Sequence, residues 1–424
     1  MFALLAPVRF GIPRRSRDGP YRHEGHGQGK FSRPVFLPDW SQFSPSGPSR
    51  YLEFRLAKCY IAERNDDAYR RPTHSMKALI LAGGEGTRLR PLTLNTPKPI
   101  VPVANIPFLR YQIELLRQHN IREVILSLSY QPSKIEALLG DGSSLGTKIH
   151  YVVEQSPLGT AGAFKNAELL LNEATVVFNG DILCELDITE VIRHHQSRKA
   201  AATLVLTRVE NPSAYGLVET TSDGKITRFL EKPKADEITC NTINAGTYVL
   251  EPEVLQVIPP GENYSFERGV FPSLLKDQKR MQAYVALGYW IDIGTPQKYL
   301  QVHQDLLQRR FRPAVDILNA DSLQMPVNAR IDGNTLLASS VKLGEEVSIL
   351  SSSIGEDCII GDHASIENAV IWPGVTIGPY SKLSSCIVGR GCQIGHHVTL
   401  SRGVVLGDHS RVTDYSLVSG EGAR

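Results

Sequence analysis

Residues 81–93, which read LAGGEGTRLRPLT, form a glycine-rich turn that follows an apolar run. Glycine has no Cβ, so the backbone N–H groups of such a turn can approach a polyphosphate closely. Arg88, inside the turn, adds a planar guanidinium group that suits phosphate oxygens. The spacing matches neither a dinucleotide-binding turn nor a Walker A loop, and tight turns with a surface arginine are common. Taken alone, the turn fits both a phosphate-binding loop and an ordinary surface turn.

A lysine held between two prolines follows this turn. Lys98 lies in the segment 96–99, which reads TPKP, and a proline on each side restricts the backbone around it. A rigidly held ammonium group near phosphates can offset the negative charge that builds up in phosphoryl transfer. Together the two features favour a site for a nucleoside triphosphate.

Two aspartates are candidates for holding a divalent cation. Asp181 follows the apolar strand-like run 175–178, and Asp292 follows Trp290. Mg²⁺ prefers oxygen ligands and is often held by one or two carboxylates together with phosphate oxygens. An aspartate at the end of a strand is also a common turn or capping residue. Their assignment as a metal pair therefore depends on the resemblance described below.

The chain from Met76 onward alternates between strand-like and helix-like runs. The expected strands are 77–82, 123–128, 149–153, 175–179 and 202–207, and the expected helices are 108–118, 161–171 and 188–198. Such alternation predicts an α/β domain with a doubly wound, mostly parallel, Rossmann-like sheet. In sheets of this kind the ligands lie beyond the carboxyl ends of the strands.

A different pattern begins after residue 310. Apolar residues recur there every five or six residues, and many are followed by glycine. Ile349, Ile366, Leu383 and Leu400 are seventeen residues apart, so three steps make one turn and equivalent residues stack. The pattern resembles the hexapeptide repeats of a left-handed parallel β-helix, in which successive coils bury one apolar column.

These patterns divide the chain into four segments, namely a disordered extension at 1–75, an α/β domain at 76–305, a linker at 306–340 and a β-helix at 341–424. The resemblance described below implies that the second segment is a nucleotidyltransferase domain. The first segment carries 13 basic and 7 acidic side chains and eight prolines, and it shows little periodicity. Its arginine content also fits a targeting segment, although its acidic residues and its short apolar run are poor for that role.

Charge and cysteine content exclude several classes of function. A net charge of +2 over 424 residues gives no general attraction to nucleic acid, and no run approaches the roughly 18 apolar residues of a membrane-spanning helix. We therefore expect neither nucleic acid nor membrane as a partner. The six cysteines contain no C-x-x-C pair and form no small secreted framework, so we expect a reducing cytoplasm.

The glycine-rich turn and the TPKP segment together resemble the signature of the sugar-nucleotide pyrophosphorylases. The resemblance covers residues 76 to about 300 and continues through PLGTAG at 157–162, NGD at 179–181, EKP at 231–233, NAG at 244–246 and WIDIG at 290–294. With a hexapeptide tail attached, the mannose-1-phosphate guanylyltransferases are the nearest type. The resemblance implies a reaction between a nucleoside triphosphate and a sugar 1-phosphate that gives a nucleotide-sugar and pyrophosphate.

The resemblance also assigns roles to individual residues. The implied catalytic residues are Arg88, Lys98, Asp181 and Asp292, of which the two aspartates hold Mg²⁺. The implied nucleotide-binding residues are Leu81, Ala82, Gly83, Gly84, Gly86, Thr87, Glu154, Gly159 and Thr160. The implied sugar-phosphate-binding residues are Gly216, Glu231, Lys232 and Asn244.

One of these residues bears on the choice of base. In the family, the position of Glu154 faces the Watson–Crick edge of the base, where a carboxylate accepts both N–H groups of guanine. GTP and mannose 1-phosphate are therefore the expected substrates. A small change of register would instead place Gln155 there, whose amide suits a pyrimidine or adenine. Glucose-1-phosphate uridylyl- or thymidylyltransferase thus stays an alternative.

A second alternative is a non-catalytic subunit that binds a nucleotide-sugar and regulates an active partner. Such a subunit could lose its catalytic charges, whereas this chain retains Arg88, Lys98, Asp181 and Asp292. We therefore favour the enzyme. We also expect a homo-oligomer, because the edge of a β-helix is a natural surface to cover.

Overall fold

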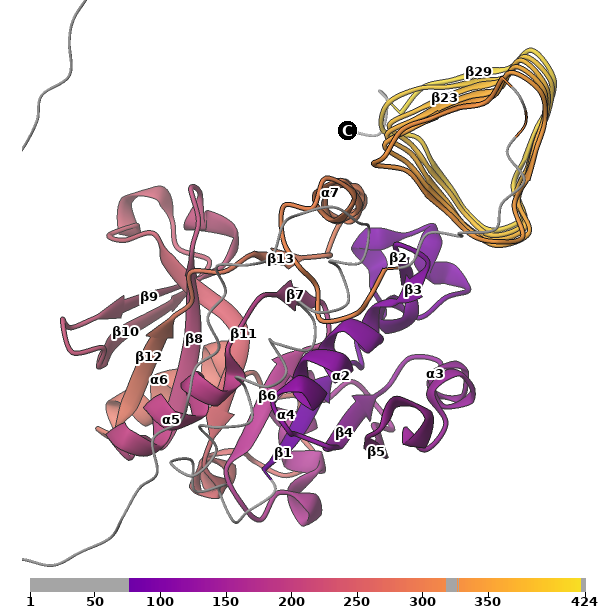
Figure 1. The fold of residues 1–424 in the computed structure, drawn as a ribbon. Helices are drawn as coiled ribbons and strands as arrows, with labels where there is room; N and C mark the ends of the chain where they lie inside the picture. The colour runs from indigo at the N-terminus through magenta and orange to yellow at the C-terminus, as the bar shows by residue number, and fades with distance from the viewer. Residues whose placement is uncertain (1–75, 318–325, 327, 421–424) are drawn as a thin grey trace, which may run out of the picture. The chain divides into compact units, whose positions relative to one another are not determined.

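β1 (Lys77–Leu81) lies inside a nine-stranded sheet of the computed structural model, which describes residues 76–317, 326 and 328–420. The expected extension at 1–75 lies outside the described residues. The strands run side by side in the order β10-β9-β11-β6-β1-β4-β5, and β8 pairs with β11 and β12 (Figure 1). The bounds are β4 (Glu123–Leu128), β5 (Lys148–Val153), β6 (Thr175–Asn179), β8 (Ala202–Arg208), β9 (Gly216–Thr220), β10 (Ile226–Glu231), β11 (Thr242–Leu250) and β12 (Met281–Val285).

The sheet has a parallel half and a mixed half. β6, β1, β4 and β5 run parallel to one another, whereas β11 runs antiparallel to β6 and β8. Ala78, Leu79 and Ile80 in β1 are fully buried, as expected for a parallel strand whose two faces are both covered. The parallel half therefore carries the carboxyl ends at which a ligand is expected.

Helices cover both faces of this sheet. Successive side chains of a strand point to opposite sides, so neighbouring residues of β1 pack in two different cores. Leu79 packs in a core with Phe164 and Phe271, whereas Ile80 packs in a second core with Leu116 and Val191. The helices are α2 (Phe108–Gln118), α3 (Pro132–Leu139), α4 (Gly159–Asn166), α5 (Ile188–Arg198), α6 (Phe271–Lys276) and α7 (Pro296–Leu307). The expected doubly wound α/β class is confirmed.

Two short strand pairs lie outside the large sheet. β2 (Pro102–Val103) pairs with β3 (Ile106–Pro107), and β7 (Ile182–Cys184) pairs antiparallel with β13 (Trp290–Asp292). The second pair matters for function because it joins two segments that are about a hundred residues apart in the chain. Both segments belong to the resemblance described above.

The hexapeptide repeats form three parallel sheets, which Figure 1 shows as the sides of a triangular coil. The first sheet contains β14 (Arg330–Ile331), β17 (Ser348–Leu350), β20 (Ser365–Glu367), β23 (Lys382–Ser384), β26 (Thr399–Leu400) and β29 (Leu417–Val418). The second contains β15 (Leu336–Leu337), β18 (Ser353–Ile354), β21 (Val370–Ile371), β24 (Ile387–Val388) and β27 (Val405–Leu406). The third contains β16 (Lys342–Leu343), β19 (Ile359–Ile360), β22 (Thr376–Ile377), β25 (Gln393–Ile394) and β28 (Arg411–Val412).

The predicted apolar column lies at the centre of this coil. Ile349 pairs with Ile366, Ile366 with Leu383 and Leu383 with Leu400, and all four are buried. The expected β-helix is therefore confirmed. It begins earlier than the expected boundary at residue 341, because β14 and β15 already belong to its sheets. The inward-facing residues of β14 and β15 are not followed by glycine, unlike those of many later strands.

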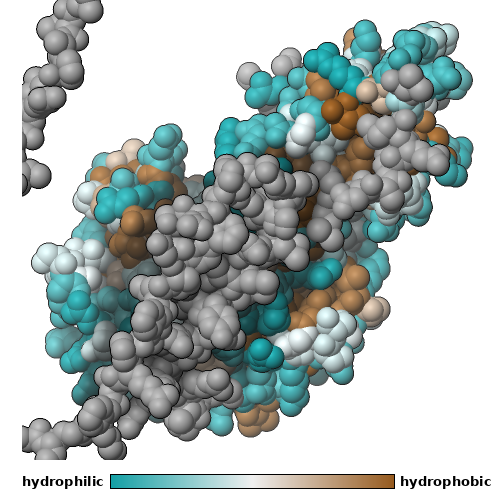
Figure 2. Space-filling model, in the orientation of Figure 1, coloured by the Kyte–Doolittle hydropathy of each residue, from teal (hydrophilic) through white to brown (hydrophobic). Residues whose placement is uncertain are grey.

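The described residues contain no helix long and apolar enough to cross a membrane. Outside the residues drawn in grey, the face in Figure 2 is mostly hydrophilic, with hydrophobic residues in separate patches.

Candidate active site

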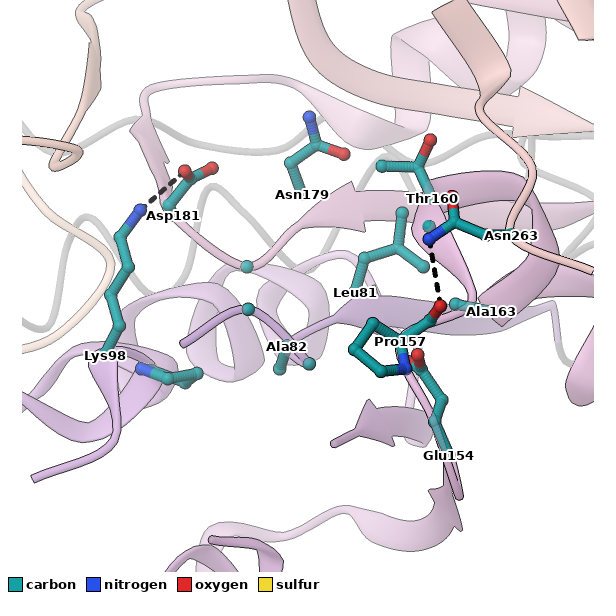
Figure 3. Close-up of a pocket in the computed structure, with 15 residues that line it drawn as sticks. Leu81, Ala82, Lys98, Glu154, Pro157, Thr160, Ala163, Asn179, Asp181 and Asn263 are labelled. Atoms are coloured by element: carbon teal, nitrogen blue, oxygen red, sulfur yellow. Dashed lines mark hydrogen bonds and ion pairs between the residues drawn. The ribbon is translucent and has the colours of Figure 1, made fainter. Parts of the chain in front are cut away.

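The carboxyl ends of β1 and β6 open into a cavity of about 340 Å³ (Figure 3). Its position agrees with the general location of ligands in doubly wound sheets. It is lined by Leu81, Ala82, Gly83, Gly84, Lys98, Pro99, Glu154, Pro157, Gly159, Thr160, Ala163, Asn179, Gly180, Asp181 and Asn263. Nine of these fifteen residues are among the catalytic and nucleotide-binding residues expected from the sequence. Gly86, Thr87 and Arg88 lie in the same turn but not in this lining.

The glycine-rich turn packs tightly against the lysine between prolines. Gly86 has a φ of +65°, and a Cβ at this position would lie 2.8 Å from Cβ of Lys98. The left-handed backbone and the close approach both exclude larger residues. The turn and the lysine are therefore positioned by each other, which explains why their sequence motifs occur together.

Lys98 forms an ion pair across the cavity with Asp181. Its Nζ donates a hydrogen bond of 2.7 Å to Oδ2 of Asp181, which is drawn as a dashed line in Figure 3. Lys98 lies at the start of a 3-10 turn (Lys98–Ile100), and its side chain is 11% exposed. Burial makes the long side chain rigid, so its charge stays at one place.

Asp292 lies next to Asp181 through the pairing of β13 with β7. Asp292 is opposite Ile182, and the backbone N–H of Ile293 donates a hydrogen bond of 3.0 Å to the carbonyl oxygen of Asp181. The backbone of Asp181, just before β7, therefore lies beside the end of β13 that carries Asp292. The two residues expected to hold a metal ion are thus neighbours through the main chain, whereas only Asp181 lines the cavity.

The carboxylate of Asp292 is held by three donors. Its Oδ2 accepts hydrogen bonds from the hydroxyl of Tyr215 at 3.0 Å and from Nζ of Lys298, and its Oδ1 accepts from the N–H of Gly294 at 3.1 Å. Burial favours a higher pKa for Asp292, but Lys298 and Tyr215 outweigh it and lower the pKa below the usual value. Asp292 is therefore ionised at neutral pH, as a ligand of a divalent cation must be.

Arg88 approaches the same carboxylate. A Cβ placed on Gly294 would lie 2.9 Å from Nη2 of Arg88 and 2.8 Å from Oδ1 of Asp292, so both groups flank this glycine. Arg88 is exposed and follows Gly86 in the turn. The four charged residues that were expected to be catalytic thus lie in one region.

Glu154 is buried beside the glycine-rich turn. Its Oε1 accepts a hydrogen bond of 3.1 Å from the hydroxyl of Ser127, and its Oε2 accepts one of 3.0 Å from the N–H of Leu158. A Cβ on Gly83 would lie 2.8 Å from Oε1. The carboxylate is thus fixed in orientation, and each oxygen keeps further acceptor capacity for a ligand.

Gly159 and Thr160 begin α4, and the side chain of Thr160 is tied to a neighbouring segment. Its hydroxyl donates to Oε2 of Glu267 at 3.0 Å and accepts from the N–H of Phe266 at 2.9 Å. Gly159, with a φ of +69°, approaches the backbone of Tyr264. These two residues therefore contribute backbone and shape to the cavity.

The expected sugar-phosphate residues gather at one end of β9 and β10, outside the lining of the cavity. Gly216 pairs with Glu231, and a Cβ on Gly216 would lie 3.1 Å from Oε2 of Glu231. The next residue, Lys232, is exposed, and its N–H donates to the carbonyl of Tyr215 at 2.9 Å. Burial, and then the charge of Glu267, raise the pKa of Glu231 above its ordinary value.

Asn244 is the fourth expected sugar residue, and its side chain bonds within the protein. Its amide donates to the hydroxyl of Tyr248 at 2.8 Å, and its Oδ1 accepts from the N–H of Gly246 at 3.0 Å. Tyr248 in turn donates to Oε1 of Glu267 at 3.4 Å. Asn244 and Glu267 are therefore linked through one tyrosine.

Sequence reasoning missed several residues at this site. Tyr215 and Lys298 hold Asp292, Glu267 holds Thr160, and Asn263 bonds the carbonyl of Pro157 at 2.9 Å. For Lys298 a signal was present, because Thr295 and the proline after it are typical of a helix start that follows Asp292 directly. The other three carry no local signal, since their contacts join distant segments.

Two family models match the chain. A model for nucleotidyl transferases matches residues 77–309, and a model for the LbH domain of EIF2B subunit epsilon matches residues 315–418. A mannose-1-phosphate guanylyltransferase of Mycobacterium tuberculosis is 44% identical over 238 residues, which are 56% of this chain and 66% of the relative. A UTP–glucose-1-phosphate uridylyltransferase of Synechocystis is 33% identical over 321 residues, which are 70% of this chain and 83% of the relative.

A solved structure shows the same fold. It belongs to a Bacillus anthracis protein that is provisionally described as a glucose-1-phosphate thymidylyltransferase and was solved with sucrose. The TM-score is 0.51 at 24% identity, and the match covers 56% of this chain and 96% of that one. The nucleotidyl transferase model covers more than half of the 424 residues, and the uridylyltransferase is covered over most of its length. The chain therefore belongs to the nucleotidyl transferase family.

Proposed function

We propose that the protein joins GTP to mannose 1-phosphate and releases GDP-mannose and pyrophosphate, with Mg²⁺ as its cofactor. The observation that carries this proposal is the gathering of Arg88, Lys98, Asp181 and Asp292 at the carboxyl ends of the parallel strands. A regulatory subunit without catalysis has no need of this set. In such a subunit these charges would repel one another or lose hydration without a function.

The donor set suits a divalent cation. The carboxylates of Asp181 and Asp292 are each paired with a lysine, and a backbone hydrogen bond from Ile293 to Asp181 joins their two segments. Oxygen ligands of this kind are the ones that Mg²⁺ prefers. The cation supplies charge stabilisation to the phosphates when it is bound.

The reacting groups need positioning rather than proton transfer. An oxygen of the sugar 1-phosphate, already anionic, attacks the α-phosphorus of the triphosphate, the bond from this phosphorus to the bridging oxygen breaks, and pyrophosphate leaves. Because no proton has to be removed from the nucleophile, the barrier falls mainly through alignment and charge neutralisation. We assign Arg88 and Lys98 to the triphosphate and Lys232 to the sugar phosphate.

Glu154 supports guanine as the base. Its carboxylate lines the cavity in a fixed orientation and can accept the two N–H groups of guanine, whereas uracil and thymine present carbonyl oxygens beside one N–H group. The 44% identity to a mannose-1-phosphate guanylyltransferase points the same way. We assign Gly216, Glu231 and Asn244 to the hydroxyls of mannose.

Two properties of the whole protein complete the proposal. We infer a cytoplasmic location, because the five cysteines among the described residues form no disulfide with one another. We also propose a homo-oligomer in which strand edges of the β-helix are covered by a second copy.

A pyrophosphate-release screen tests the proposed reaction. Four nucleoside triphosphates are each combined with mannose, glucose and other sugar 1-phosphates in the presence of Mg²⁺. We expect the highest kcat/KM for GTP with mannose 1-phosphate. A preference for UTP or dTTP with glucose 1-phosphate would replace the substrate assignment, and no release with any pair would favour the regulatory alternative.

The variant Asp292→Asn tests the assignment of Asp292 as a metal ligand. We expect it to fold normally and to lose turnover by roughly a hundredfold or more at saturating Mg²⁺, because a lost metal ligand weakens stabilisation of the transition state. The measurement is kcat beside the melting temperature. Near-normal turnover would remove Asp292 from the metal site.

A further inference from the structure

Lys298 contacts Asp292 directly, although neither the motifs nor the expected roles include it. It lies in the first turn of α7, and its Nζ donates hydrogen bonds to Oδ2 of Asp292 and to the hydroxyl of Tyr215. The ammonium group also lies 4.9 Å from the ring centroid of Tyr215. Positive charge in the first turn of a helix opposes the helix dipole, so local helix formation does not favour lysine here.

The contact occupies the oxygen that a cation would need. Oδ2 of Asp292 accepts from both Lys298 and Tyr215, and Oδ1 accepts from the N–H of Gly294. A divalent cation binds carboxylates through the same lone pairs. An ammonium group on Oδ2 and a cation on that oxygen therefore compete, by occupancy and by repulsion between like charges.

The arrangement is repeated at the second aspartate. Asp181 accepts a hydrogen bond of 2.7 Å from Lys98. The two aspartates lie on segments joined by the hydrogen bond from Ile293 to Asp181, and without countercharges their carboxylates would repel one another. The side chain of Asp292 is only 12% exposed, so water screens this repulsion incompletely.

We propose that Lys298 is a positioning residue that holds Asp292 in place in the metal-free protein and exchanges with the divalent cation when the cation binds. The proposal rests on the proposed function, because it takes Asp292 as a metal ligand. The side chain of Lys298 is 35% exposed and can leave Asp292 without opening the core. The displaced ammonium group then adds positive charge beside the phosphates of the reactants.

Binding of Mn²⁺ alone to the full-length protein tests the exchange. Free Mn²⁺ is followed by electron paramagnetic resonance, without nucleotide, for the wild type, Lys298→Met and Lys298→Arg. We expect Lys298→Met to bind Mn²⁺ about three- to tenfold more tightly, since the competing charge is gone. The same variant should lose turnover, and Lys298→Arg should restore affinity close to that of the wild type.

Two further variants test whether the change in Mn²⁺ affinity is specific to Lys298. Lys279→Met removes a lysine of similar exposure that pairs with Glu253 on the surface, and we expect it to leave Mn²⁺ affinity unchanged. Asp292→Asn should weaken Mn²⁺ binding strongly. Circular dichroism and the melting temperature establish that each variant folds.

The outcomes separate the two proposals. If Asp292→Asn weakens Mn²⁺ binding while Lys298→Met binds Mn²⁺ no more tightly than the wild type, the exchange is wrong and the metal assignment stands. If Asp292→Asn leaves Mn²⁺ binding unchanged, the metal assignment itself fails and the exchange fails with it. Equal tightening in Lys279→Met would show a general effect of net charge and would also overturn the exchange.

Discussion

Glu231 ends β10 in a half-buried position where its pKa is raised by burial and by the charge of Glu267. A carboxyl group with a raised pKa in the folded state stabilises the protein below its unfolded pKa of about 4.3, and this contribution is lost as the pH rises through the folded pKa. At neutral pH the ionised group therefore destabilises the fold. Such a cost is common at binding sites, where a ligand later supplies the missing partners.

We expect Glu231→Gln to raise the melting temperature at pH 7.5 and to leave it nearly unchanged at pH 4, because an uncharged amide carries no penalty for burial of charge. Thermal denaturation at the two pH values measures the difference. Sugar-nucleotide synthesis should fall in the same variant. An equal shift of the melting temperature at both pH values would show that the carboxylate charge is not the cause.

Glu154 is expected to control the choice of base. We predict that Glu154→Gln reduces the preference for GTP over the other triphosphates by roughly 5- to 100-fold, since a good bidentate base contact discriminates by about 1–3 kcal/mol. The measurement is the ratio of kcat/KM values. Ser127→Ala is the matched control, because it removes a donor to Oε1 and keeps the carboxylate. Unchanged discrimination in Glu154→Gln would remove the base-reading role.

At the scale of elements, the glycine-rich turn shows how a local motif controls a distant charge. Gly86 has a φ of +65°, and a Cβ added to it would lie 2.8 Å from Cβ of Lys98. A Cβ added to Gly84, two residues earlier, would have no neighbouring atom within 4 Å. The two glycines therefore have different reasons to be present.

We predict that Gly86→Ala destabilises the protein by about 1–2 kcal/mol and lowers turnover, because the backbone is strained and Lys98 is pushed away from Asp181. Gly84→Ala should leave the free energy of unfolding nearly unchanged. Denaturant titration of both variants compares them. Similar unfolding energies for the two would contradict the packing argument.

The elements that could be predicted from the sequence are those with a strong local period. α2 at Phe108–Gln118 and β6 at Thr175–Asn179 have the expected bounds, because their apolar spacing and flanking residues are unambiguous. β14 and β15 were missed, although their inward residues Ile331 and Leu337 continue the six-residue spacing of the later coils.

The candidate site divides in the same way. The residues inside motifs, such as Lys98 and Asp181, could be named from the sequence, whereas their pairing at 2.7 Å could not. Tyr215 reaches Asp292 from a segment 77 residues away in the chain. Contacts of this kind depend on how β7, β9 and β13 come together, which no local pattern specifies.

At the scale of the whole molecule, the matched families account for residues 77–309 and 315–418. The first described strand begins at Lys77, and every proposed site residue lies between Leu81 and Lys298. The β-helix adds a column of buried aliphatic residues that is continuous from coil to coil. Its stability grows with each neighbouring coil, as in other repeat proteins.

We predict that a chain beginning at Met76 retains the kcat and KM of the full chain, because it keeps all the residues proposed for the site. Steady-state kinetics and the melting temperature of the two chains are compared side by side. Loss of folding or of activity in the shorter chain would show that residues 1–75 contribute to the catalytic domain.

The backbone hydrogen bond between Ile293 and Asp181 ties the two aspartates to one ladder of peptide groups. The backbone of Asp181 is therefore held beside the end of β13 by main-chain geometry, with about 4.8 Å between neighbouring strands, whereas contacts such as that of Lys298 orient the carboxylates. Substitutions elsewhere in the protein can alter reach, charge or selectivity while this separation stays the same. The relative position of the two main-chain segments therefore tolerates side-chain substitution better than the orientation of the carboxylates does.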